Sequence, residues 1–161
     1  GDGSSEGAGV TSTTSDYHLK YAVPMIEGLT LQYGKSTVNY QEALLDDVYH
    51  VGHILYSAGP VSVGYRMGTF EDGTAGANAN EMEAYAIAFN VNDEFSVSFA
   101  TQDKEYDVPS GTNVTETSDA INASYTMGAM TLRGTIGEAD AVGGVSGVTD
   151  EHMELSAIFA F

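Results

Sequence analysis

The C-terminal stretch His152-Met153-Glu154-Leu155-Ser156-Ala157-Ile158-Phe159-Ala160-Phe161 indicates the fold most directly. Successive side chains of a β-strand point to opposite faces, so the residues are counted in steps of two. The odd-numbered residues from Met153 to Phe161 are all apolar, whereas the even-numbered ones are mostly small or polar. In a soluble sheet, an edge strand that ends in Phe-Ala-Phe would promote aggregation. It is the surface expected of a closed barrel immersed in lipid.

Composition and charge exclude several classes of function. The chain has 161 residues with Lys+Arg 5 and Asp+Glu 23, giving a net charge of -18. Nucleic acids are poor partners for such a chain, because phosphate binding needs clustered cations. The absence of cysteine excludes disulfides, thiolate metal sites and Cys nucleophiles. No run of eighteen apolar residues marks a transmembrane helix.

Eight further segments alternate like the terminal one, so nine strands are expected in all. The eight are 17–23, 29–36, 48–57, 61–68, 84–89, 95–100, 121–127 and 130–136. Most place Tyr, Phe, Leu, Val, Ile or Met on one face and small or polar residues on the other. The segment 48–57 is ambiguous because each face carries a histidine among apolar residues. Its facing is left open, with a bulge as one alternative.

The connections between these strands alternate between short and long. Short turns are expected at 24–28, 58–60, 90–94 and 128–129, and long loops at 38–47, 70–80, 103–118 and 137–149. Nearly all acidic residues are expected to lie in loops or at strand ends. Short turns on the periplasmic side and long extracellular loops are typical of outer-membrane barrels. A β-sandwich gives no reason for such sorting. The pattern predicts an all-β fold, a transmembrane antiparallel up-and-down β-barrel.

At this point the chain resembles the bacterial outer-membrane general porin family, in particular porins of marine alphaproteobacteria. The matching features are the Tyr/Phe-rich alternating strands, the acidic loops and the terminal Phe161. The resemblance implies a water-filled channel for passive diffusion of small hydrophilic solutes, with no enzymatic activity. It also implies a homotrimer in the bacterial outer membrane, in contact with lipid and lipopolysaccharide. The odd-numbered residues from Met153 to Phe161 are expected to take part in the subunit contact.

The odd strand count predicts that further strands complete the barrel, because single-chain bacterial barrels have an even number. The segment 17–161 is interpreted as the C-terminal part of a barrel of about sixteen strands. Residues 1–16 are interpreted as the remnant of an extracellular loop. The alternative is a miscount by one and a small eight-stranded barrel, acting as an anchor or adhesin through its acidic loops. Small inward residues such as Gly64 and Ala86 would leave that barrel underfilled.

Four charged residues are candidates for lining the pore. Lys20, Arg66 and Arg133 fall on the polar faces of their strands. Charge on the lipid side costs roughly 2–4 kcal/mol at mid-depth, so these side chains are expected to face the lumen. Glu154 is the acidic residue clearly on a polar face within a strand. The resemblance implies that the cations form a positive wall opposite an acidic constriction loop. A plainer interpretation is local pairing, for example of Arg133 with Glu154, which would contribute little stability in water.

The remaining patterns are interpreted structurally. Aromatic residues are expected to form girdles at the membrane interfaces, namely Tyr17, Tyr85, Phe89, Phe95, Phe159 and Phe161. No motif for catalysis or phosphate binding is present, and no cofactor is expected. The pairs Asp46-Asp47, Glu71-Asp72 and Asp150-Glu151 offer oxygen ligands for Ca²⁺ or Mg²⁺. Solvated negative surface is the competing interpretation of these pairs.

Overall fold

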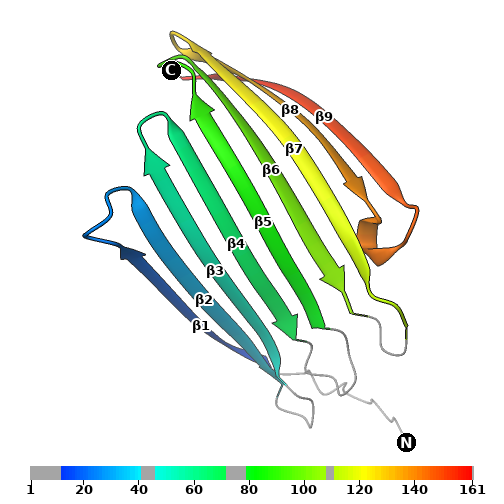
Figure 1. Cartoon of the computed structure of the whole chain (residues 1–161). Helices are drawn as coiled ribbons and strands as arrows, with labels where there is room; N and C mark the ends of the chain where they lie inside the picture. The colour runs from blue at the N-terminus through cyan, green and yellow to red at the C-terminus, as the bar shows by residue number, and fades with distance from the viewer. Residues whose placement is uncertain (1–11, 41–45, 72–78, 108–110, 161) are drawn as a thin grey trace, which may run out of the picture.

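The computed structural model describes residues 12–40, 46–71, 79–107 and 111–160. Its nine strands form one sheet in the order β1 to β9, each antiparallel to the next (Figure 1). The strands are β1 Ser12–Ala22, β2 Leu29–Tyr40, β3 Asp47–Ala58, β4 Val61–Glu71, β5 Ala79–Asn90, β6 Phe95–Tyr106, β7 Val114–Met127, β8 Met130–Asp140 and β9 Thr149–Phe159. A single 3-10 turn, η1 Val142–Gly144, lies between β8 and β9.

The nine-strand, up-and-down, antiparallel fold expected from the alternation is confirmed. The alternative based on a miscount by one strand is wrong. The sheet is a single curved layer with β1 and β9 at its two opposite edges (Figure 1). It is therefore open within the described residues. No helix in this part of the chain is long and apolar enough to cross a membrane.

The four short turns are confirmed, at 23–28, 59–60, 91–94 and 128–129. The long loops, however, were expected to be longer than they are. Strand β1 begins at Ser12 rather than Tyr17, so 12–16 is strand and not loop, while 1–11 lie outside the described residues. Strand β6 runs on to Tyr106 and β7 begins at Val114, inside the expected 103–118 loop. The reason is that acidic residues occupy strand positions there, which hides the alternation.

The facing of β3 is resolved by its neighbours. Its register with β2 and β4 is unbroken, so the strand contains no bulge. Ile54 lies opposite Leu31 and Tyr65, which places it on the Tyr/Leu side of the sheet. His53 lies opposite Gln32 and Arg66, on the other side. The two histidines of this strand consequently face opposite ways.

The described residues contain no buried hydrophobic core. Large apolar side chains remain exposed all across one face, among them Ile121 at 60% and Met153 at 80%. A contiguous apolar surface of this extent marks an interaction with a membrane or another apolar partner. Cross-strand hydrogen bonds and side-chain contacts between neighbouring strands, such as the stacked rings of Tyr49 and Phe70, hold the layer together. Burial of the apolar face therefore has to come from outside the sheet.

Candidate functional site

The register assigns every strand residue to one of two faces, because directly opposed residues point to the same side. The apolar face carries Leu19, Tyr33, Ile54, Tyr65, Tyr85 and Phe99. The polar face carries Lys20, Gln32, His53, Arg66, Ala84 and Gln102. These two surfaces are the candidate functional features of the molecule.

The apolar face forms a band that crosses the strands obliquely. We call a set of directly opposed residues a row. One row begins at Tyr21 on β1, passes through Tyr85 on β5 and ends at Glu151 on β9, so it lies inside the band at one edge of the sheet and outside it at the other. The border of the band on the long-loop side, which we call its upper border, thus moves from Tyr17 on β1 to Met153 on β9, six rows and three same-face positions away. That is roughly 20 Å of strand across a sheet roughly 38 Å wide, an angle of about 30°.

The extent of the band along a strand is comparable with that of a hydrocarbon layer. On β8 the apolar face carries Met130, Leu132 and Ile136, with Gly134 between the last two. Neighbouring positions on one face lie roughly 6.8 Å apart, so the four positions span roughly 20 Å along the strand from the first Cα to the last. Outer-membrane barrels have an apolar band about 25 Å tall and strands tilted by about 35–45°. A band crossing the strands at an angle is what a flat apolar slab produces on tilted strands.

Aromatic side chains gather at the borders of the band. Tyr17 and Tyr85 lie at the upper border, on the side of the band that faces the long loops. Phe89, Phe95 and Phe159 lie at the lower border, beside the short turns. These are positions of the predicted girdles; Phe161 lies outside the described residues. Amphipathic rings prefer such interfacial positions.

Above the band, the apolar face becomes acidic, and we call this region the acidic margin. Its members are Glu71, Glu81, Glu83, Asp103, Glu105, Asp119, Glu138, Asp140 and Glu151. The expectation that nearly all acidic residues lie in loops or at strand ends is therefore wrong. Some carboxylates face each other directly, such as Glu83 and Asp103, which is destabilising. The Tyr65 hydroxyl donates to Glu83 at 3.0 Å and the Thr117 hydroxyl to Asp103 at 2.7 Å, which offsets part of this cost.

The acidic margin does not assemble a metal centre within the described residues, where no group of three or more His, Asp or Glu could hold an ion. The pair Asp150-Glu151, a candidate for Ca²⁺ or Mg²⁺, is split by the strand. Asp150 lies opposite Ala139 on the polar face and Glu151 opposite Glu138 on the apolar face. Asp72 of a second candidate pair lies outside the described residues.

All four residues expected to line a pore lie on the polar face. Lys20 and Arg66 share one row, which also contains Gln32 and His53. Arg133 on β8 and Glu154 on β9 lie at the other end of the sheet. Lys104, expected in a loop, also lies on this face, opposite Glu116. Four of the five cations therefore share the polar face, although they are not brought together at one point, and Lys35 lies on the apolar face opposite Tyr17.

The expected pairing of Arg133 with Glu154 is wrong. Arg133 lies opposite Ser156, whereas Glu154 lies opposite Thr135. The recorded ion pair of Glu154 is instead with His152 on its own strand, at 3.7 Å, with both side chains exposed. Residues two apart on a strand share a face, which explains the contact. An exposed pair of this kind contributes little to stability.

Three polar-face residues were not singled out from the sequence. His18, Gln32 and His53 line a hollow of about 290 Å³ together with Arg66. The alternation shows which face each residue occupies only when the strand is unambiguous, and β3 is not. Their proximity depends on the register between four strands, for which the sequence carries no local signal.

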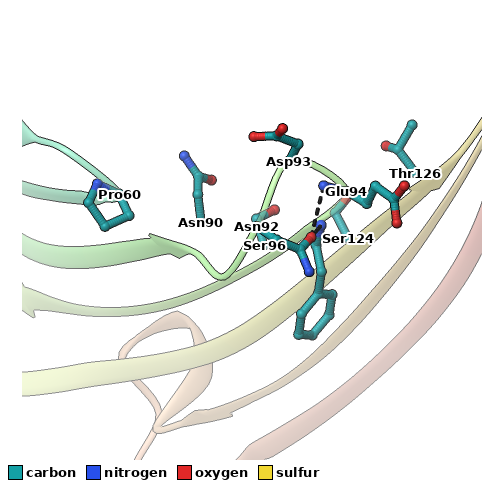
Figure 2. Close-up of a pocket in the computed structure, with 9 residues that line it drawn as sticks. Pro60, Asn90, Asn92, Asp93, Glu94, Ser96, Ser124 and Thr126 are labelled. Atoms are coloured by element: carbon teal, nitrogen blue, oxygen red, sulfur yellow. Dashed lines mark hydrogen bonds between the residues drawn. The ribbon is translucent and has the colours of Figure 1, made fainter.

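A second hollow, of about 520 Å³, lies at the short-turn end beside the β5–β6 turn (Figure 2). Asn92 shapes this turn. Its side-chain oxygen accepts the backbone N–H groups of Glu94 at 2.9 Å and Phe95 at 2.8 Å. This is the local bonding by which Asn stabilises turns. The hollow is thus a feature of turn geometry.

Replacing Asn92 by Ala is expected to lower the free energy of unfolding by about 1–2 kcal/mol, since two hydrogen bonds are lost. Asn90→Ala serves as the control, because Asn90 lines the same hollow and its side chain makes no hydrogen bond within the described residues. Urea unfolding of both variants in detergent measures the difference. Equal stability of the two variants would contradict this role of Asn92.

No family model, curated protein or solved structure matches this chain.

Proposed function

We propose that this sheet forms part of a transmembrane β-barrel in the outer membrane of a Gram-negative bacterium, and that the barrel is a porin. The channel conducts small hydrophilic solutes by passive diffusion. The observation that carries the proposal is the oblique apolar band, bordered by aromatic rings and topped by the acidic margin. A planar hydrocarbon layer around tilted strands accounts for the angle, the height and the borders together.

The charge distribution supports the same placement. Charges on the lipid side cost roughly 2–4 kcal/mol at the midplane and about 0–1 kcal/mol near the interfaces. The acidic margin begins only above the apolar positions, for example at Glu83 above Tyr85 and at Glu138 above Ile136. This level corresponds to headgroups in a membrane. Lipopolysaccharide, with divalent cations between its phosphates and these carboxylates, is the proposed partner of the margin.

The topology supports a ring larger than this sheet. Strands β1 and β9 point in the same direction, because each strand is antiparallel to the next. Joining them directly would create a parallel pair, so an antiparallel ring requires an odd number of further strands. A barrel of about sixteen strands needs roughly seven more. We propose that these come from elsewhere in a longer polypeptide.

The polar face supports a wide lumen. Across its middle it carries Gly64, Ala86, Ala100 and Ala120 in one row. A small closed barrel needs its interior filled by side chains, whereas these residues leave space. Lys20, Arg66, Arg133 and Glu154 are then the proposed wall of a water-filled pore. By the resemblance to general porins, we propose a homotrimer, with Met153 and Leu155 contributing to the subunit contact.

Single-channel recording in planar bilayers tests this function. The purified protein is expected to produce discrete, ohmic current steps in potassium chloride, because a wide aqueous pore conducts in proportion to voltage. The same preparation unfolded by boiling is the control and should be silent. Persistent silence from protein shown to be folded by its heat-modifiable mobility in gels would overturn the proposal.

A further inference from the structure

We propose that the polar face of β1–β4 holds an oxyanion-binding site formed by His18, Gln32, His53 and Arg66. This proposal rests on the proposed function, because passing solutes reach the site through the pore. The solutes that we expect it to bind are small molecules that carry a phosphate or carboxylate group. Unlike conduction, binding at this site can be measured on protein in detergent.

The site is built by register across four strands. One row contains Lys20 on β1, Gln32 on β2, His53 on β3 and Arg66 on β4, each directly opposite the next. His18 lies on the same face of β1, two residues before Lys20. The side chains of His18, Gln32, His53 and Arg66 surround the hollow of about 290 Å³, and Gly34 forms part of its floor.

The floor is open because of a glycine. A Cβ at Gly34 would come within 3.1 Å of the Val51 side chain, so glycine keeps this part of the hollow unfilled. Strands lie about 4.8 Å apart, so the row from Gln32 to Arg66 spans about 10 Å. Long side chains on its two ends can reach the same small anion in the hollow.

The lining groups are suited to an anion. Arg66 presents a guanidinium fork, Gln32 an amide NH₂ and each histidine a ring N–H. None of the four side chains makes an ion pair within the described residues. The nearest carboxylate on this face of β1 is Asp16, which lies four rows and three strands from Arg66. Arg66 is therefore available for bidentate recognition of a carboxylate or phosphate group.

The other polar-face cations lack this arrangement. Lys104 lies opposite Glu116, and its ammonium sits 4.3 Å from the ring centre of Tyr106. Arg133 lies between Ser124 and Ser156, with no histidine or second cation in its row of β7–β9. Arg133 also lines a hollow, of about 380 Å³, with Asn122 and several serines, but that hollow contains no histidine. Within the described polar face, a guanidinium and two histidines line one hollow at β1–β4.

Isothermal titration calorimetry of the full-length protein in detergent tests the site, with inorganic phosphate and succinate as separate probes at low salt. Saturable binding of at least one probe is expected, and the stronger probe identifies the favoured group. Arg66→Gln is expected to weaken that binding about tenfold, because it removes a charge-assisted hydrogen-bond pair. Lys20→Gln changes another residue of the same row, on the edge strand β1, and is expected to weaken binding of that probe about threefold.

Lys35→Gln is the matched control for overall charge. Lys35 lies on β2 but on the apolar face, opposite Tyr17 and His50, so its loss should leave the affinity within twofold. Absence of saturable binding, or equal weakening by Lys20→Gln and Lys35→Gln, would overturn the site. Arg66-dependent binding without bilayer conductance would reject the pore and keep the site. Ohmic conductance without binding would reject the site and keep the pore.

Discussion

Ile87→Arg is expected to destabilise the protein in lipid bilayers by about 2–4 kcal/mol. Ile87 lies in the middle of the apolar band, between Val63 on β4 and Phe99 on β6. A guanidinium at this position would enter hydrocarbon if the band contacts lipid. If the apolar face were bathed in water, the same charge would be nearly neutral for stability, since surface substitutions usually are.

The neighbouring residue provides the control for this prediction. Ala86 is exposed on the polar face of the same strand, opposite Gly64 and Ala100, so an arginine has room there. Ala86→Arg is expected to cost less than about 1 kcal/mol. Urea titration of the protein refolded into phosphatidylcholine vesicles measures both variants. Equal costs, or a larger cost for Ala86→Arg, would contradict the assigned faces.

Gly28→Ala is expected to cost at least about 3 kcal/mol of folding free energy. Gly28 ends the turn between β1 and β2 with φ of 81°, a conformation that favours glycine. An added Cβ would also overlap the backbone oxygen of Ser57 on β3. The Ser57 N–H donates to the Gly28 carbonyl at 3.0 Å, so neither backbone can move away without losing that bond.

Gly59→Ala separates the cost of the positive φ from the cost of the steric overlap. Gly59 also has a positive φ, of 54°, but an added Cβ there would meet no atom within 4 Å. Only the left-handed backbone cost of about 1–2 kcal/mol is therefore expected. The temperature at which each variant loses its compact gel mobility compares them. If the two variants unfold at the same temperature, the close approach of Gly28 to β3 is not energetically significant.

The strand count and the short turns could be predicted from the sequence because both depend on local signals. Alternation has a period of two residues, and turns such as Gly59-Pro60 interrupt it visibly. The same local signal failed at the long-loop ends. Glu81, Glu83 and Asp103 occupy positions that face the same side as Tyr85 and Phe99, so the polarity changes along the strand and imitates a loop.

The candidate sites depend on register, and sequence pattern alone is a weak guide to it. Arg66 could be placed on a polar face, but its alignment with His53 required the facing of β3, where both sides carry apolar residues and a histidine. The expected Arg133–Glu154 pair failed because it also depends on register, which places Ser156, two residues beyond Glu154 on β9, opposite Arg133. The oblique band becomes visible only after all nine strands are aligned.

Contact between the apolar face and hydrocarbon is tested most directly by tryptophan fluorescence, because the chain contains no tryptophan. Phe99→Trp places the reporter in the apolar band, and Ala100→Trp places it on the polar face of the same strand, opposite Ala86 and Ala120. In vesicles of brominated lipid, the first variant is predicted to be strongly quenched and the second to respond instead to aqueous acrylamide. Quenching of Phe99→Trp by acrylamide but not by brominated lipid would contradict the membrane placement.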